Sequence, residues 1–193
     1  MEALRTLNFW LLLSMLFLWA CCSFIILAHV VRHAIDLGVS TLEAATILTV
    51  IGGASIPGRL AMGRLSDTWG SKRVCLISVL ILMGAMSWLL WASDLWMLYL
   101  FAAFFGLSFG ASSPLMAAVI GDAFGTRNLG IILGALQTGW SAGCAFGPVL
   151  AGHIYDINGS YTPAFLLGIG ISLGAALLIA LLRIRGHRNR ADA

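Results

Sequence analysis

Arg59 is the residue of this sequence whose type and position most directly suggest chemistry. It lies in a long apolar stretch between Glu43 and Asp67, in which Arg64 is the only other full charge and is close enough to the end to reach the membrane surface. An arginine within a membrane helix costs about 2.5–3.5 kcal/mol, so it normally faces a partner, a cavity or a ligand. A guanidinium held in a water-filled cavity suggests a binding site for an anion.

The composition indicates that most of the surface meets lipid. Of the 193 residues, 60% are hydrophobic and 10% are charged, and no soluble domain of this size has a core that can hold so much apolar surface. A spanning helix needs about 20 apolar residues, and continuous runs favour helices over the alternating strands of a barrel. We therefore expect an all-α membrane protein, a single bundle of six transmembrane helices. The expected spans are about 7–31, 43–64, 74–92, 95–120, 129–152 and 162–184.

The placement of charge predicts the orientation of the bundle. One side would hold the N-terminus, two of the turns and the C-terminus, and the positive-inside rule assigns such a basic side to the cytoplasm. We expect both termini there, in an integral multi-pass protein of the cell membrane, with the first run kept as a span because it is too long for a signal peptide. The basic side carries Arg5, Arg64, Lys72, Arg73, Arg127, Arg183, Arg185, Arg188 and Arg190.

The basic C-terminal tail follows a span directly, so we interpret it as an anchor on anionic lipid and expect no nucleic-acid partner. The cysteines lie in or at the edge of apolar runs without CxxC spacing, which is typical of small buried hydrophobes. We expect no metal and no other cofactor. Neither an HExxH motif nor paired intramembrane carboxylates are present, so we do not expect an enzyme.

Two turns of the sequence share one pattern. Residues 63–71 and residues 152–160 both read G-x-x-x-D-x-x-G-S, at an offset of 89 residues, which corresponds to three spans. Like turns on opposite faces of a membrane indicate a three-plus-three arrangement with inverted topology, a recurring plan of secondary transporters.

The first of these turns contains a candidate conformational switch. A carboxylate at the end of a span could cap a neighbouring helix or pair with a base, and release it when helices move. The alternative is a plain polar turn whose basic flank only marks the topology. The residues of the candidate switch are Gly63, Asp67, Gly70, Lys72 and Arg73.

The span at 129–152 is rich in glycine, typical of a face on which helices pack closely in lipid; bending at Gly147 and Pro148 is the alternative. Within the same span, Gln137, Trp140 and Ser141 could line a cavity or could pack between helices.

Two further sets of residues leave alternatives open. His29 and His33, spaced four apart near the outer end of the first span, could form a proton relay or could anchor the outer rim. In the fourth span, Pro114 follows Ser112 and Ser113, which suggests a kink or, alternatively, contact with a ligand.

The loop Gly63-x-Leu65-x-Asp67-x-x-Gly70-x-Lys72-Arg73 resembles the cytoplasmic loop signature of the major facilitator superfamily. Four further stretches resemble the second half of its monocarboxylate and oxalate:formate transporter branch: HAIDLGVS, GRLAMGRLSD, FGTRNLGIILG and GPVLAGHIYDINGSYTPAF. The resemblance covers nearly the whole chain. It implies the C-terminal six-helix half of a twelve-span carrier, which needs an N-terminal half or a second copy as its partner.

In that branch an arginine in span eight engages the substrate carboxylate, and Arg59 matches it. Animal monocarboxylate carriers have an acidic residue one turn earlier, where this chain has Ser55, so the route of any H+ coupling stays open. Oxalate carriers have a lysine in span eleven, which 129–152 lacks, and this favours a monoanion over a dianion.

We therefore expect a secondary transporter of small organic anions, in particular monocarboxylates, that works by alternating access as a symporter or antiporter. One alternative keeps the fold, with a drug or sugar as cargo and a structural role for Arg59. Another is a six-span channel or membrane-embedded enzyme.

Overall fold

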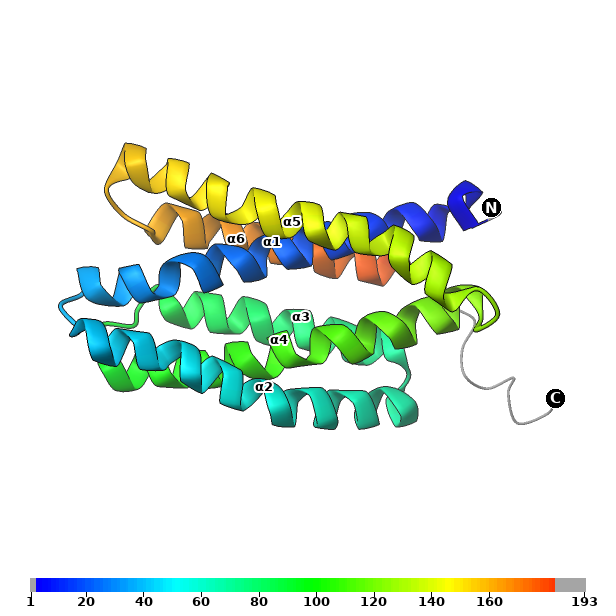
Figure 1. The fold of residues 1–193 in the computed structure, drawn as a ribbon, viewed down its shortest axis with the longest axis horizontal. Coiled ribbons are helices and arrows are strands. Elements are labelled where there is room, and N and C mark those ends of the chain that lie inside the picture. The colour runs from blue at the N-terminus through cyan, green and yellow to red at the C-terminus, as the bar shows by residue number, and fades with distance from the viewer. Residues whose placement is uncertain (1–2, 183–193) are drawn as a thin grey trace.

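The protein, seen here as a computed structural model that describes residues 3–182, consists of six long helices joined by short turns (Figure 1). All six are long and apolar enough to cross a membrane, which confirms the predicted number of spans. A short 3-10 helix, Ala3–Arg5, precedes them. The helices are α1 Leu7–Asp36, α2 Thr41–Trp69, α3 Ser71–Leu89, α4 Leu95–Phe124, α5 Leu129–Asn158 and α6 Thr162–Leu181.

Some helices extend beyond the apolar runs because polar side chains form hydrogen bonds with the backbone groups at their ends. At the start of α2 the Ser40 hydroxyl accepts a hydrogen bond from the Glu43 N–H at 3.3 Å and donates one to the Glu43 carboxylate at 2.6 Å. Such N-caps let a helix begin in a polar segment. The predicted end of the last span at 184 lies outside the described residues, as do the basic tail residues Arg183, Arg185, Arg188 and Arg190.

Successive helices run in opposite directions, so the bundle has two distinct ends. The N-terminus, the α2–α3 turn and the α4–α5 turn lie at the same end (Figure 1). We call this the basic end because Arg5, Lys72, Arg73 and Arg127 lie in or beside these segments. The α1–α2, α3–α4 and α5–α6 turns lie at the opposite end.

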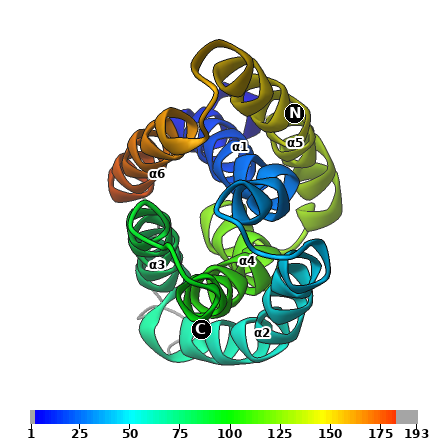
Figure 2. The same cartoon turned by 90° about the vertical axis from the view of Figure 1, so that its left-hand side faces the viewer.

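The helix contacts show the inverted repeat directly. The first helix, α1, packs chiefly on α5 and then on α6, whereas α4 packs chiefly on α2 and then on α3. Exchanging α1 with α4, α2 with α5 and α3 with α6 converts one set of contacts into the other, and α1 and α4 run in opposite directions. Seen along the bundle, α2 and α5 lie on one side, α3 and α6 on the other, and α1 and α4 between them (Figure 2).

Glycines form the two principal seams between the repeats. At each of them an added Cβ would meet the backbone of the neighbouring helix closer than 3 Å, so the helices touch backbone to backbone. On the α1–α5 seam Gly139 lies against Leu13, Gly143 against Phe17 and Gly147 against Cys21; on the α2–α4 seam Gly58 lies against Leu107, Gly106 against Ile51 and Gly110 against Ser55.

The packing interpretation of the glycine-rich span is therefore confirmed for three of its glycines. Near its start, Gly130 and Gly134 have no atom of a neighbouring element within 4 Å of an added Cβ, and at its end an added Cβ on Gly152 would lie 3.9 Å from the His29 ring. Helix α5 continues without interruption through Pro148, and α4 continues through Pro114.

Candidate functional site

The side of the bundle formed by α2 and α5 is the least covered. The apolar spanning window is 22% buried in α2 and 17% buried in α5, against 39–56% in the other four helices. These two helices have no extended contact with each other. On this side of the bundle α5 lies beside α1, and α2 lies beside α4 (Figure 2). The predicted substrate residues all lie on these two helices, so we call this side the open side.

Arg59 lies one turn past Ser55, the midpoint of α2, toward the basic end. Its side chain is exposed and has no hydrogen bond or ion pair among residues 3–182. Ser55 and Gly63, one turn before and after it, contact α4 at Gly110 and near Pro114, where an added Cβ on Gly63 would lie 3.7 Å from the proline ring. Arg59 therefore lies on the part of α2 that is next to α4, and its charge has no ionic partner among residues 3–182.

Helix α5 brings Gln137, Trp140 and Ser141 onto one face, because residues three and four apart are neighbours on a helix. Gln137 and Ser141 are exposed, and their polar groups have no hydrogen-bond partner in the described part of the chain. Trp140 is half-buried and lies one turn from the midpoint of α5 toward the basic end, at a depth comparable to that of Arg59.

Several hydroxyl groups within the helices are already satisfied by the backbone of their own helix. Ser55 donates to the Gly52 carbonyl at 2.7 Å and Ser112 donates to the Phe109 carbonyl at 2.7 Å, as serines in membrane helices commonly do. The exposed hydroxyl of Ser113 has no such partner in residues 3–182. In sequence Ser113 lies between Gly110 and Pro114, the two α4 residues that contact α2 one turn before and one turn after Arg59.

The loop motif joins the ends of several helices. Gly70 ends α2 and begins α3 with a φ of 87°, a left-handed conformation that favours glycine. Lys72 Nζ donates to the backbone carbonyls of Ala180 at 2.8 Å and Leu182 at 2.6 Å, at the end of α6. A cation at a helix C-terminus satisfies carbonyls that have no partner within the helix.

The neighbouring Ser71 hydroxyl donates to the Asp122 carboxylate at 2.7 Å, which ties the start of α3 to the end of α4. Asp67 and Arg73 are exposed and have no partner within residues 3–182. In this conformation Lys72, rather than Asp67, is the motif residue that caps a neighbouring helix.

The two histidines lie toward the opposite end of α1, against α5 and the start of α6. His29 contacts the Pro148 carbonyl through Nε2 at 3.1 Å and the Tyr161 hydroxyl through Nδ1 at 3.3 Å. Because a carbonyl only accepts, Nε2 carries a proton, and in a neutral ring the tyrosine hydroxyl donates to Nδ1. His33 packs edge-on against the ring of Phe165 at 5.0 Å, and its buried Nε2 has no partner in the described chain.

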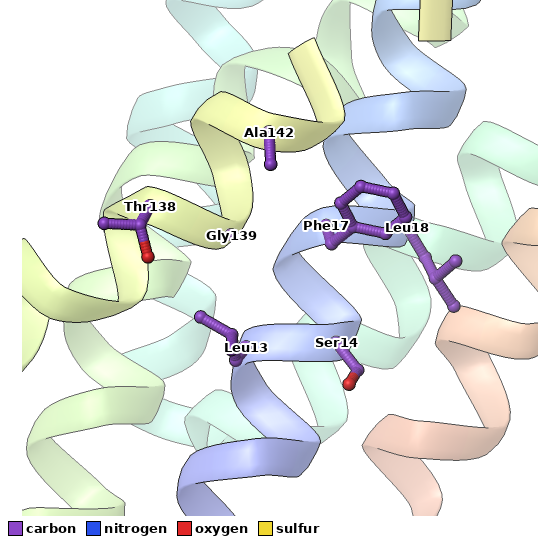
Figure 3. Close-up of a pocket in the computed structure, with 7 residues that line it drawn as sticks. All are labelled: Leu13, Ser14, Phe17, Leu18, Thr138, Gly139 and Ala142. Atoms are coloured by element: carbon purple, nitrogen blue, oxygen red, sulfur yellow. The ribbon is translucent and has the colours of Figure 1, made fainter. Parts of the chain in front are cut away.

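A separate groove of about 610 Å³ runs between α1 and α5 (Figure 3). Its walls carry no charged side chain, and none of the predicted substrate residues line it, so it offers no site for an anion. The lining residues are Leu13, Ser14, Phe17, Leu18, Thr138, Gly139 and Ala142.

Sequence reasoning missed the aromatic side chains that surround Trp140. Phe24 of α1 lies 6.5 Å from the Trp140 ring and 6.4 Å from the ring of Phe109 in α4. The only local signal was that Phe105, Phe109 and Ser113 follow one another at four-residue intervals and so share a face of their helix.

Six spanning helices in two inverted sets of three define an integral multi-pass membrane protein, and within residues 3–182 its open side carries a cation without an ionic partner. The family model described as Major Facilitator Superfamily matches residues 9–193, and the chain belongs to this superfamily.

Proteins with similar sequences include two that are named as monocarboxylate transporters. Monocarboxylate transporter 13 of Rattus norvegicus is 32% identical over 161 residues, which cover 82% of this chain and 38% of that protein. Monocarboxylate transporter 12 of Xenopus laevis is 30% identical over 180 residues, 90% of this chain and 38% of that protein. The class H tetracycline resistance protein of Pasteurella multocida is 32% identical over 131 residues, 67% of this chain and 31% of that protein. The chain thus spans well under half the length of these relatives.

Proposed function

We propose that the chain forms the C-terminal half of a secondary transporter that carries small monocarboxylates by alternating access. The names of two relatives support this substrate class, and the 38% coverage of those relatives supports the assignment as one half. The basic end faces the cytoplasm, following the positive-inside rule, in the plasma or inner membrane of the cell.

The observation that carries the proposal is the uncompensated cation of Arg59 about one turn from the middle of a spanning helix. A guanidinium at this depth is expensive unless it has a partner or water beside it. A carboxylate can bind it through two parallel hydrogen bonds, and in a poorly polar cavity this pairing offsets the desolvation of the arginine. The substrate carboxylate therefore binds Arg59, with the free hydroxyl of Ser113 as a neighbouring donor.

The open side is where the second bundle packs. An N-terminal six-helix half, or a second copy of the chain, covers α2 and α5 and encloses a cavity near the membrane midplane. Gln137, Trp140 and Ser141 face this cavity from α5, opposite Arg59. Asp67 and Arg73, which have no partner among residues 3–182, engage the second half when the transporter changes state, together with Gly63, Gly70 and Lys72 of the same turn.

In the proposed transporter the two histidines of α1 carry the coupled protons. His29 and His33 lie four residues apart on α1, and His29 already bridges Tyr161 and the Pro148 carbonyl. We assign them as the proton relay of an H+-coupled carrier, because position 55, where animal carriers have an acidic residue, is a serine here.

Uptake of a labelled short monocarboxylate tests the proposal, in vesicles from cells that produce the chain in its native context. Arg59→Lys keeps the charge but loses the planar two-point contact, so uptake should fall by about tenfold or more. Arg64→Lys, on the same helix but at its end, is the matched control and should retain uptake. Equal uptake by both variants would show that Arg59 does not bind the substrate anion.

A second candidate is transport of another small solute, such as a drug, with Arg59 structural. The similarity to a tetracycline resistance protein favours it. In that case Arg59→Lys would lower the thermal stability of the protein rather than its selectivity for carboxylates.

A further inference from the structure

Three aromatic side chains from three helices meet near the middle of the open side. They are Phe24 of α1, Phe109 of α4 and Trp140 of α5, and we call them the aromatic wall. The Phe24 ring lies 6.4 Å from Phe109 at 69° and 6.5 Å from Trp140 at 86°, both edge-to-face arrangements. Edge-to-face contacts at these separations are favourable beyond the area they bury.

All three members of the wall are half-buried, so each keeps some accessible surface in the six-helix bundle. The inner parts are held in place by further rings: Trp19 lies 6.4 Å from Trp140, and Phe105 stacks on Phe109 at 5.9 Å. Partly accessible rings that pack against buried rings form a rigid apolar surface.

The wall begins next to the proposed carboxylate site. Phe109 is adjacent in α4 to Gly110, and Gly110 contacts Ser55 of α2, one turn before Arg59. Phe109 is at the midpoint of α4, and Phe24 and Trp140 are each within about one turn of the midpoints of their helices. The surface from Arg59 to Trp140 is therefore cationic at one edge and aromatic across its centre.

We propose that the aromatic wall makes this transporter selective for monocarboxylates whose carboxylate is attached to an aromatic ring or a similarly bulky apolar body. This inference rests on the proposed function, and it narrows the substrate class of the same site. A substrate bound by Arg59 at its carboxylate lays its body against Phe109, Phe24 and Trp140. A three-carbon acid would leave most of that surface without contact. Arg59 is the only full charge of α2 between Glu43 and Arg64, so this helix offers no second cation to bind the second carboxylate of a dianion.

The test compares two acids with the same carboxylate-bearing end, phenylpyruvate and pyruvate, as labelled uptake substrates in the same vesicles. The wild-type protein should have the higher kcat/KM for phenylpyruvate. Replacing Phe109 by Leu removes one ring and keeps an apolar side chain, so the ratio of the two kcat/KM values should fall about threefold to tenfold. Trp140→Leu should lower the ratio in the same direction.

Phe104→Leu is the matched control, because Phe104 is on the same helix but 48% exposed on a different face; it should leave the ratio unchanged. An unchanged ratio in Phe109→Leu and Trp140→Leu, or a wild-type preference for pyruvate, would overturn the aromatic wall as a selectivity device while leaving the carboxylate carrier intact. If neither acid is taken up, the proposed function fails and this inference fails with it.

Discussion

Gly58 of α2 and Gly147 of α5 occupy equivalent positions in the two inverted repeats and make equivalent contacts. They are 89 residues apart, the same offset as the repeated turn. Gly58 lies against the backbone of Leu107 in α4, and Gly147 lies against the backbone of Cys21 in α1. Each repeat therefore uses a glycine of its second helix to approach the first helix of the other repeat. The helices of the two repeats are interleaved and do not form two separate blocks.

This relationship predicts that the seam glycines are sensitive to a single methyl group. Gly58→Ala and Gly143→Ala should each destabilise the protein by about 1–3 kcal/mol, because the added Cβ would collide with backbone that cannot move without separating the helices. The measurement is the thermal unfolding midpoint in detergent. Gly84→Ala and Gly134→Ala, where an added Cβ meets no neighbouring atom, are the controls and should be neutral or slightly stabilising. Similar midpoints for all four variants would show that the seams are loosely packed.

The capping of α6 by the loop motif gives a second prediction. Lys72→Met removes both hydrogen bonds to the last carbonyls of α6 while keeping an apolar stem, and should cost about 1 kcal/mol. Amide hydrogen exchange in the last turn of α6 should become faster. Arg73→Met, at the neighbouring exposed position without a partner in residues 3–182, should leave that exchange unchanged. Unchanged amide exchange in Lys72→Met would show that other contacts hold the last turn of α6.

The hydrogen bond between His29 and Tyr161 can be isolated by a double-mutant cycle. His29→Phe, Tyr161→Phe and the double variant should show a coupling of about 0.5–1.5 kcal/mol in unfolding free energy, because the hydroxyl and the ring nitrogen satisfy each other in a partly buried site. Tyr155→Phe is the control, since its hydroxyl donates to Asp36 at 3.1 Å instead, and its effect should add to that of His29→Phe. Simple additivity for Tyr161 as well would mean that this contact has no energetic weight.

The open side should be reachable by water in the assembled transporter. Ser113→Cys and Ser141→Cys, in a background in which Cys144 is replaced by Ala, should react with a membrane-impermeant thiol reagent, and a bound monocarboxylate should slow the reaction. Leu173→Cys should stay unreactive because lipid surrounds this residue, which is 52% exposed on α6. Equal reactivity at all three positions would argue against a substrate path along this side.

The six spans, their repeat and the arginine within the second span are all visible in the order of the amino acids. Hydropathy over about 20 residues is a local property, and a repeated turn is visible wherever four identities recur at a fixed offset. Helix ends were less predictable: α1 continues to Asp36 and α5 to Asn158, because helix geometry does not stop where the apolar residues stop.

The partners of each helix were decided only by the tertiary structure. Lys72 finds its hydrogen-bond partners 108 and 110 residues away in α6, and the aromatic wall draws on α1, α4 and α5. Such contacts depend on which helix faces cross, and here each first helix crosses the second helix of the other repeat more extensively than it contacts its neighbour in the chain. The sequence by itself determined that the chain is a membrane bundle with an arginine within one of its spans, since burial in lipid follows from composition. Which side that cation faces, and what surrounds it, came from packing between segments far apart in the chain.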